Sequence, residues 1–308
     1  MTAHDEFSAA QASLLRRHGV GAESHFVDVP AVEGPAHVLI TGDGPPVVLV
    51  PGFGDPAAMW APLMAELDGF RLFAVDRPNF GLTGRAAQRT ATLRQLAVGF
   101  LGQVLDQLGL ERPLVIGNSI GSLWSIWLAL DRPDRVAAMA HIGCPAFALG
   151  TSAPAPMRLL SIRPLGRLLM KLSPPSPQQV ERFARMVGED LSGAPELRDL
   201  LVAAQKLPGV PAAILDLLHA VVRLRGARPE IALTKEQLAR IRQPVLLVWG
   251  ARDAFGPVEV GREAARVIPD AALHVLRDGG HIPWVAQPGE VAVPLVPFLR
   301  TRSGRTRP

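Results

Sequence analysis

The chain has 308 residues, of which 48% are hydrophobic and 19% are charged, a composition that fits a folded protein with a sizeable core and excludes disorder of the whole chain. The formal net charge of +4 comes from the C-terminal end, where Arg300, Arg302, Arg305 and Arg307 stand without an acid. The remaining 28 positive side chains balance 28 acidic ones, so we expect no basic surface for nucleic acid.

The first half of the chain alternates strand and helix patterns. An amphipathic helix is predicted over 4–19, and the runs at 24–29 and 36–41 predict a hairpin or two successive strands. Further on, short apolar runs predict buried strands at 47–50, 70–75, 113–117 and 136–143. Helical patterns lie between them, at 59–67, 92–110 and 121–133. This alternation predicts a mostly parallel, doubly wound sheet with helices on both faces, an α/β fold.

The pattern changes between residues 145 and 240, where prolines cluster and helical segments follow one another without a convincing strand. Ser176 and Pro177 stand as N-cap and first residue of one helix. Another predicted helix, 211–226, has a broad apolar face, and Thr234 with Gln237 forms a capping box. We therefore expect an all-helical insertion of about ninety residues inside the α/β domain.

After the insertion the sheet pattern resumes. Strands are predicted at 244–250 and 272–278, with a helix at 258–268 between them. A last helical segment runs to about residue 300, interrupted by Pro294 and Pro297. The basic residues 301–308 predict a disordered tail.

One uncharged stretch, residues 113–130, is long enough to cross a membrane. Gly117, Asn118, Ser119 and Gly121 lie near its centre, so a buried strand, a turn and a buried helix explain it better. Residues 1–10 carry acids and no apolar core, which predicts no secretory signal. Together with the single cysteine, Cys144, this predicts a cytoplasmic protein without a membrane span.

The segment "GNSIGS" at 117–122 places Ser119 between a predicted strand and a predicted helix. A side chain on such a sharp turn projects its hydroxyl outward, and flanking glycines let the helix pack close to the strand. The backbone N–H of Ile120 is then free to face developing negative charge. A second donor is expected from the loop after 47–50, from the N–H of Phe53 between two glycines. Ser119 is thus a candidate nucleophile.

A serine hydroxyl needs a base, and the chain offers eight histidines. His281 is the one that follows a predicted strand inside a glycine-rich loop. An acid that orients it should also follow a strand, and Asp253 does so. Asp278 is too close along the chain to reach the imidazole, and Asp76 stands in a context typical of a stabilised turn. The residues predict a Ser119–His281–Asp253 triad.

The segments "VPGFG…W", "DRPNFGLT", "GNSIGS", "WGARDAF" and "GGHIPW" resemble, in this order, the signature segments of the α/β-hydrolase superfamily. The resemblance implies a hydrolase core at 1–144 and 241–300 and a helical cap at 145–240. Members of this kind usually have His-Gly before the oxyanion residue, whereas this chain has Pro51-Gly52. The substitution predicts an altered loop in front of Ser119.

A serine at the sharp strand-to-helix turn, called the nucleophile elbow, favours acyl transfer. The first hypothesis is therefore hydrolysis of a hydrophobic carboxylic ester through an acyl-enzyme. The elbow also resembles that of carbon–carbon bond hydrolases that act on ring-cleavage dienones, and Pro51 motivates a third hypothesis, a non-hydrolytic cyclase or binding protein. Trp60 and Trp284 stand near the predicted site as candidate substrate contacts. No cofactor and no metal are expected, and the partners predicted are a small hydrophobic substrate and, as an open alternative, a second copy in a homodimer.

Overall fold

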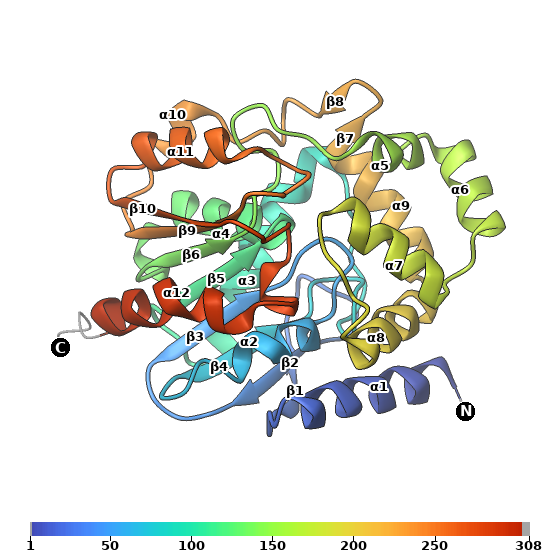
Figure 1. The fold of residues 1–308 in the computed structure, drawn as a ribbon, viewed down its shortest axis with the longest axis horizontal. Coiled ribbons are helices and arrows are strands. Elements are labelled where there is room, and N and C mark those ends of the chain that lie inside the picture. Colours follow the sequence, from blue (N-terminus) through green and yellow to red (C-terminus); the bar gives the residue numbers. More distant parts are fainter. Residues whose placement is uncertain (1, 304–308) are drawn as a thin grey trace.

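The computed structural model describes residues 2–303, and eight strands in it form one twisted sheet (Figure 1). The strand order is β1-β2-β4-β3-β5-β6-β9-β10. The bounds are β1 Glu23–Asp28, β2 Pro35–Thr41, β3 Pro46–Val50, β4 Arg71–Val75, β5 Leu114–Asn118, β6 Met139–Ile142, β9 Val245–Gly250 and β10 Ala271–Leu276.

Six strands from β4 to β10 run parallel, while β1 and β2 form an antiparallel hairpin at one edge. Every residue of β5 and β9 is buried, as expected for central strands that helices cover on both faces. The predicted α/β class with a mostly parallel sheet is therefore confirmed, and residues 24–41 form a hairpin.

Helices cover the two faces of this sheet. In Figure 1, α2 and α12 lie together in front of the strands, while α3 and α4 lie together behind them. The bounds of the helices outside the insertion are α1 Ala3–Arg17, η1 Ala57–Trp60, α2 Ala61–Met64, η2 Thr90–Thr92, α3 Leu93–Gln107, α4 Ile120–Asp131, η3 Pro133–Arg135, α11 Val258–Val267, η4 Pro283–Val285 and α12 Pro288–Ser303.

Between β6 and β9 the chain forms a group of helices over one end of the sheet (Figure 1). They are α5 Ala155–Leu160, α6 Arg163–Leu172, α7 Pro177–Met186, α8 Pro195–Lys206, α9 Val210–Val221 and α10 Lys235–Leu238. A two-stranded ladder, β7 Val222–Arg223 with β8 Gly226–Ala227, is the exception to the helical character predicted for this segment. We call residues 145–240 the cap.

The C-terminal helix differs from the sequence prediction in two ways. It is continuous through Pro294 and Pro297, because Val291, Leu295 and Leu299 bury one face against the domain, and tertiary packing outweighs the missing N–H donors. It also includes 301–303, which we expected in the tail; residues 304–308 lie outside the described part of the chain.

Among residues 2–303, no single helix is long and apolar enough to cross a membrane; α8 and α9 qualify only as a pair bent by 87°.

Candidate active site

Ser119 occupies a strained turn between β5 and α4. Its φ of 50° and ψ of −115° are unfavourable for a residue with a side chain and are typical of a nucleophile held by its surroundings. A Cβ at Gly121 would collide with the carbonyl oxygens of Val50 and Pro51, and one at Gly117 would collide with Ser122. The two glycines therefore allow α4 to pack onto β3 and β5, which presents Ser119 at the carboxyl end of the sheet.

His281 and Asp253 come together at the same end of the sheet, after β10 and β9. The Nδ1 atom of His281 lies 2.8 Å from Oδ2 of Asp253. The same Oδ2 accepts the N–H of Cys144 at 2.7 Å, and Oδ1 accepts the N–H of Phe255 at 2.8 Å. Asp253 is thus fixed by three hydrogen bonds and orients the imidazole with its Nδ1 proton toward the carboxylate.

The other ring nitrogen of His281, Nε2, is buried and has no hydrogen-bond partner among the described residues. Ser119 and His281 both line one cavity, and each is less than 5% exposed. No hydrogen bond joins Ser119 to this nitrogen, and catalytic hydrogen bonds of this kind often tighten only around a bound substrate. The free Nε2 is available to take the proton of the Ser119 hydroxyl.

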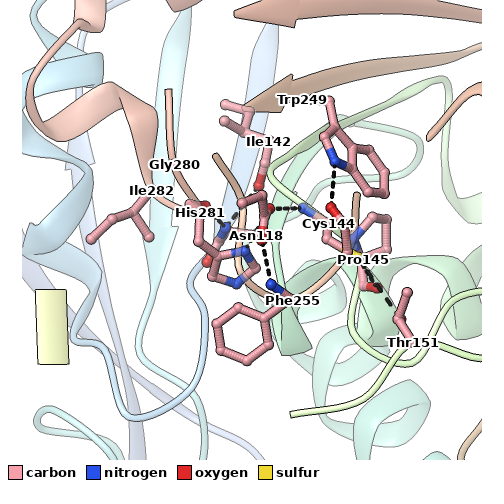
Figure 2. A network of polar contacts seen from close by, with 12 residues as sticks. Asn118, Ile142, Cys144, Pro145, Thr151, Trp249, Phe255, Gly280, His281 and Ile282 are labelled. Atoms are coloured by element: carbon pink, nitrogen blue, oxygen red, sulfur yellow. Dashed lines mark hydrogen bonds and ion pairs between the residues drawn. The ribbon is translucent and has the colours of Figure 1, made fainter. Parts of the chain in front are cut away.

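Two neighbours shape the surroundings of His281. The ring of Phe255 stacks on the imidazole with centroids 4.1 Å apart (Figure 2), which fixes the plane of the ring. Cys144 is fully buried, and burial raises the pKa of its thiol well above the ordinary value. A neutral, buried thiol is a poor nucleophile, so Cys144 acts here through its backbone N–H, which holds Asp253.

The predicted oxyanion donors come from two elements near Ser119. Ile120 is the first residue of α4 and Phe53 lies in the loop after β3. Neither N–H donates a hydrogen bond within the described part of the chain, so both are free for a ligand. The oxyanion hole itself stays a prediction.

The loop that carries Phe53 is held by Arg77, a residue that sequence reasoning did not identify. Its Nε donates to the carbonyl oxygen of Pro51 at 3.1 Å and its Nη2 donates to that of Gly52. The guanidinium is 1% exposed and lies between the rings of Phe80 and Trp124. Burial lowers the pKa of Arg77 to about 10, so the side chain stays charged at neutral pH. Arg77 therefore supports the loop in which Pro51 replaces the usual histidine.

Trp60 and Trp284, predicted as substrate contacts, are buried away from the cavity. They stack on each other with centroids 4.2 Å apart, and Nε1 of Trp284 donates to the carbonyl of Met59. Neither is more than 1% exposed, and neither lines the cavity. The two rings pack η1 against η4 instead. Met59, which precedes Trp60 in η1, does line the cavity.

The cavity above Ser119 has a volume of about 360 Å³ and lies between the sheet and the cap. Most of its lining is apolar, with methionine, leucine, valine and phenylalanine side chains from the cap helices. Arg182 is the one cationic side chain among the described residues that line it, and Asp55 is the one acid. Burial raises the pKa of Asp55 to about 7, although Arg77 and His281 oppose that rise. The cavity suits an apolar substrate with few charges.

Asp76 has the structural role that its sequence context predicted. Its carboxylate accepts the N–H of Leu82 at 2.8 Å and of Ala57 at 2.6 Å, and contacts Nδ1 of His37 at 2.7 Å. The Oγ of Ser24 lies 2.9 Å from Nε2 of His37, so a second serine–histidine–aspartate chain exists. None of these residues lines the cavity, and Asp76 stabilises the turn after β4.

Glu189, from the cap loop after α7, connects the cap to the loop of His281. Its Oε1 accepts the N–H groups of Gly280 and Ile282, both at 3.0 Å, and the N–H of His281 donates to the carbonyl of Val187. Burial raises the pKa of Glu189 to about 7, against the two backbone hydrogen bonds, His281 and Arg252, which lower it. No sequence motif marks this residue, because the contact joins segments about ninety residues apart.

Replacing Glu189 with glutamine should flatten the pH dependence of stability. A carboxyl whose pKa rises from 4.5 to about 7 on folding contributes on the order of 3 kcal/mol that is present below pH 4.5 and is lost as the pH rises through 7. The glutamine side chain keeps an oxygen for the two N–H groups and does not titrate. Urea unfolding of both proteins from pH 4.5 to pH 8 should therefore show that the free energy of unfolding of the variant rises relative to that of the wild type as the pH increases. A constant difference between them would contradict the prediction.

The mostly parallel sheet and the serine on the turn between β5 and α4 define an α/β-hydrolase fold, and comparison with known proteins agrees with this class. Residues 45–285 match the family described as alpha/beta hydrolase fold. This match spans most of the chain, and the chain belongs to that family.

Relatives and solved structures extend the comparison. The chain is 31% identical over 224 residues, covering 71% of it and 72% of the relative, to a 2-hydroxy-6-oxononadienedioate/2-hydroxy-6-oxononatrienedioate hydrolase of Cupriavidus pinatubonensis. A second enzyme so named, from Pseudomonas putida, is 26% identical and matches 90% of this chain and 91% of its own length. Carboxylesterase CesB from Bacillus subtilis is similar in structure, with a TM-score of 0.75 at 21% identity, covering 97% of this chain and 99% of that chain. The structure of the 2-hydroxy-6-oxo-6-phenylhexa-2,4-dienoate hydrolase of Rhodococcus is also similar, with a TM-score of 0.74 at 21% identity. The match covers 91% of this chain and 99% of that chain.

Proposed function

We propose that this chain is a serine hydrolase that attacks a carbonyl carbon next to an apolar group, with Ser119 as nucleophile, His281 as base and Asp253 as the acid that orients it. The observation that carries the proposal is the meeting of a strained serine and a histidine–aspartate pair at one apolar cavity. A hydrolytic reaction also agrees with the family to which the chain belongs.

The reaction follows from the positions of these groups. Nε2 of His281 takes the proton of the Ser119 hydroxyl while Oγ bonds to the carbonyl carbon, and the N–H groups of Phe53 and Ile120 stabilise the oxygen that becomes negative. When the tetrahedral intermediate collapses, the leaving group takes the proton from His281. Water, deprotonated by the same Nε2, then releases the acid and restores Ser119.

The substrate class we favour is a ring-cleavage dienone, in which hydrolysis breaks a carbon–carbon bond. The names of the relatives support this alternative better than our first hypothesis of an ester, because a 2-hydroxy-6-oxo dienoate contains no ester. The relatives' names describe dicarboxylates, whereas the cavity here offers one cation, Arg182, and an acid, Asp55. A second carboxylate would meet no second cation. We therefore propose a dienone with one carboxylate, placed at Arg182, and an apolar group at its other end.

A hydrophobic carboxylic ester is the second candidate, and the apolar lining of the cavity favours it. Such a substrate needs no cation, and its acyl chain would fill the space between the cap helices. The non-hydrolytic alternative is weaker, because Arg77 supports the loop that the Pro51 substitution had brought into question. A cytoplasmic location stays a prediction from the sequence.

Arg182→Gln should separate the two substrate classes. We expect its kcat/KM for a phenyl-substituted 2-hydroxy-6-oxo dienoate to fall about tenfold, since a charge-assisted hydrogen bond to the carboxylate is lost. Its kcat/KM for a neutral 4-nitrophenyl ester should not change. Arg185→Gln is the matched control, because Arg185 lies one turn further on α7, is exposed, and does not line the cavity.

The same panel gives the result that would overturn the dienone proposal. If esters of medium chain length react faster than any dienone, and Arg182→Gln affects neither, the ester is the substrate. If no carbonyl compound reacts and a fluorophosphonate probe does not label Ser119, the hydrolase proposal itself is wrong.

A further inference from the structure

The outward side of the cap exposes large apolar side chains that the fold leaves in solvent. Of the nine exposed large hydrophobic residues in the described part of the chain, five lie on α5, α6 and α7. On α6, Leu168 is 53% exposed and Leu172 is 71% exposed. Figure 1 shows α6 at the outer edge of the molecule, away from the sheet. Single exposed leucines are ordinary, whereas a group on adjoining helices marks an interaction surface.

Positive charge accompanies these leucines. Residues 155–180 contain four basic side chains and no acid: Arg158, Arg163, Arg167 and Lys171. Arg163 forms an ion pair with Asp216 at 3.3 Å. Arg167 and Lys171 are exposed, and within residues 2–303 neither forms an ion pair. The free charges on α6 are therefore all positive.

The helical geometry of α6 puts the two kinds of side chain side by side. Gly166 faces the protein, where a Cβ would collide with the carbonyl of Leu160 and meet Leu215. Leu165, Leu168 and Leu172 recur at helical spacing on one side of that contact, and Arg167 and Lys171 lie one turn apart on the other. Leu168 and Lys171 are three residues apart, so the apolar and basic stripes adjoin on the solvent side of the helix.

This surface also borders the cavity. Met170 and Ser173, at the end of α6, line the cavity, as does Phe183 of α7. Phe183 is itself 41% exposed, so it belongs to both the cavity wall and the outer surface. An apolar molecule in contact with the exposed side of Phe183 would therefore touch a side chain that also lines the cavity of Ser119.

We propose that α6, with Leu159 and Phe183 beside it, docks the cap onto an anionic membrane surface, where the leucines enter the headgroup boundary and Arg167 and Lys171 meet lipid phosphates. A protein that docks in this way lies on the membrane surface and needs no spanning helix. A second copy of the chain fits the surface less well, because a two-fold contact would place the positive side chains of α6 against their own copies. The acids nearby, Asp216 and Glu181, already form ion pairs with Arg163 and Arg198.

Co-sedimentation with lipid vesicles tests the proposal by measuring binding alone, independently of enzymatic activity. The wild type should bind vesicles of phosphatidylcholine with about 30% phosphatidylglycerol, bind pure phosphatidylcholine much more weakly, and lose affinity at high salt. Arg167→Gln/Lys171→Gln should lower the partition coefficient about 25-fold, from about fivefold for each charge. Leu168→Gln/Leu172→Gln should lower it at least about tenfold.

Val293→Gln is the matched control, because Val293 is 68% exposed and lies on α12, far from α6 in Figure 1. It should bind as the wild type does, and circular dichroism should show all variants folded. Equal binding by wild type and the leucine variant, or no binding to either vesicle, would overturn the proposal. Sedimentation velocity supplies a third outcome: a dimer that the leucine variant abolishes, without vesicle binding, would assign this surface to a second copy.

Discussion

Replacing Ser119 with alanine is expected to lower kcat by about four to six orders of magnitude, because no acyl-enzyme can form and only binding and the oxyanion donors remain. The loss should be confined to kcat, since the cavity loses one oxygen atom. The variant should fold as the wild type does, because alanine takes the same strained φ of 50°. Steady-state kinetics and urea unfolding together check this.

Ser122→Ala is the matched control for that experiment. Ser122 is buried in the first turn of α4, three residues after Ser119, and its Oγ has no hydrogen-bond partner among the described residues. Its removal should leave kcat unchanged. A fluorophosphonate probe should label the wild type and Ser122→Ala but not Ser119→Ala. Labelling that survives in Ser119→Ala would contradict the prediction, and Ser24, beside His37, would be the next serine to replace.

The sequence was sufficient to predict a candidate site residue where a reactive side chain directly follows a recognisable strand pattern. Ser119 stands between an apolar run and a helical pattern, and His281 and Asp253 each follow a predicted strand. Because parallel strands bring their carboxyl ends to one edge of the sheet, the sequence pattern alone predicts that these three distant segments lie together. The structure puts His281 within hydrogen-bond distance of Asp253.

The sequence could not predict where individual side chains point, nor which side chains contact segments that are distant along the chain. Trp60 and Trp284 stand beside the right loops, but their rings turn away from the cavity and stack on each other. Arg77 follows β4 in a motif that reads as a turn, and only the packed structure shows its guanidinium reaching the loop after β3. Glu189 acts across the boundary between cap and core, where no periodic pattern exists.

Replacing Arg77 with methionine is expected to lower kcat about 10²- to 10³-fold with little change in KM. The size is that of a lost oxyanion donor, because the guanidinium holds the carbonyls of Pro51 and Gly52 and so orients the N–H of Phe53. Methionine fills similar space between Phe80 and Trp124 but leaves two buried carbonyls without their donor. Each costs about 1–3 kcal/mol of unfolding free energy, so kinetics belong at a temperature where circular dichroism shows a folded variant.

Arg77→Lys distinguishes positioning from mere stability. Lysine keeps the charge but lacks the planar fork that reaches two carbonyls at once, so we expect kcat between those of Arg77→Met and the wild type. Burst kinetics with a 4-nitrophenyl ester locate the effect, because a displaced oxyanion donor slows acylation of Ser119, whereas lost stability lowers only the amount of active enzyme. If kcat per active site, titrated with the fluorophosphonate probe, equals that of the wild type in both variants, Arg77 contributes stability alone, and the loop after β3 holds Phe53 without it.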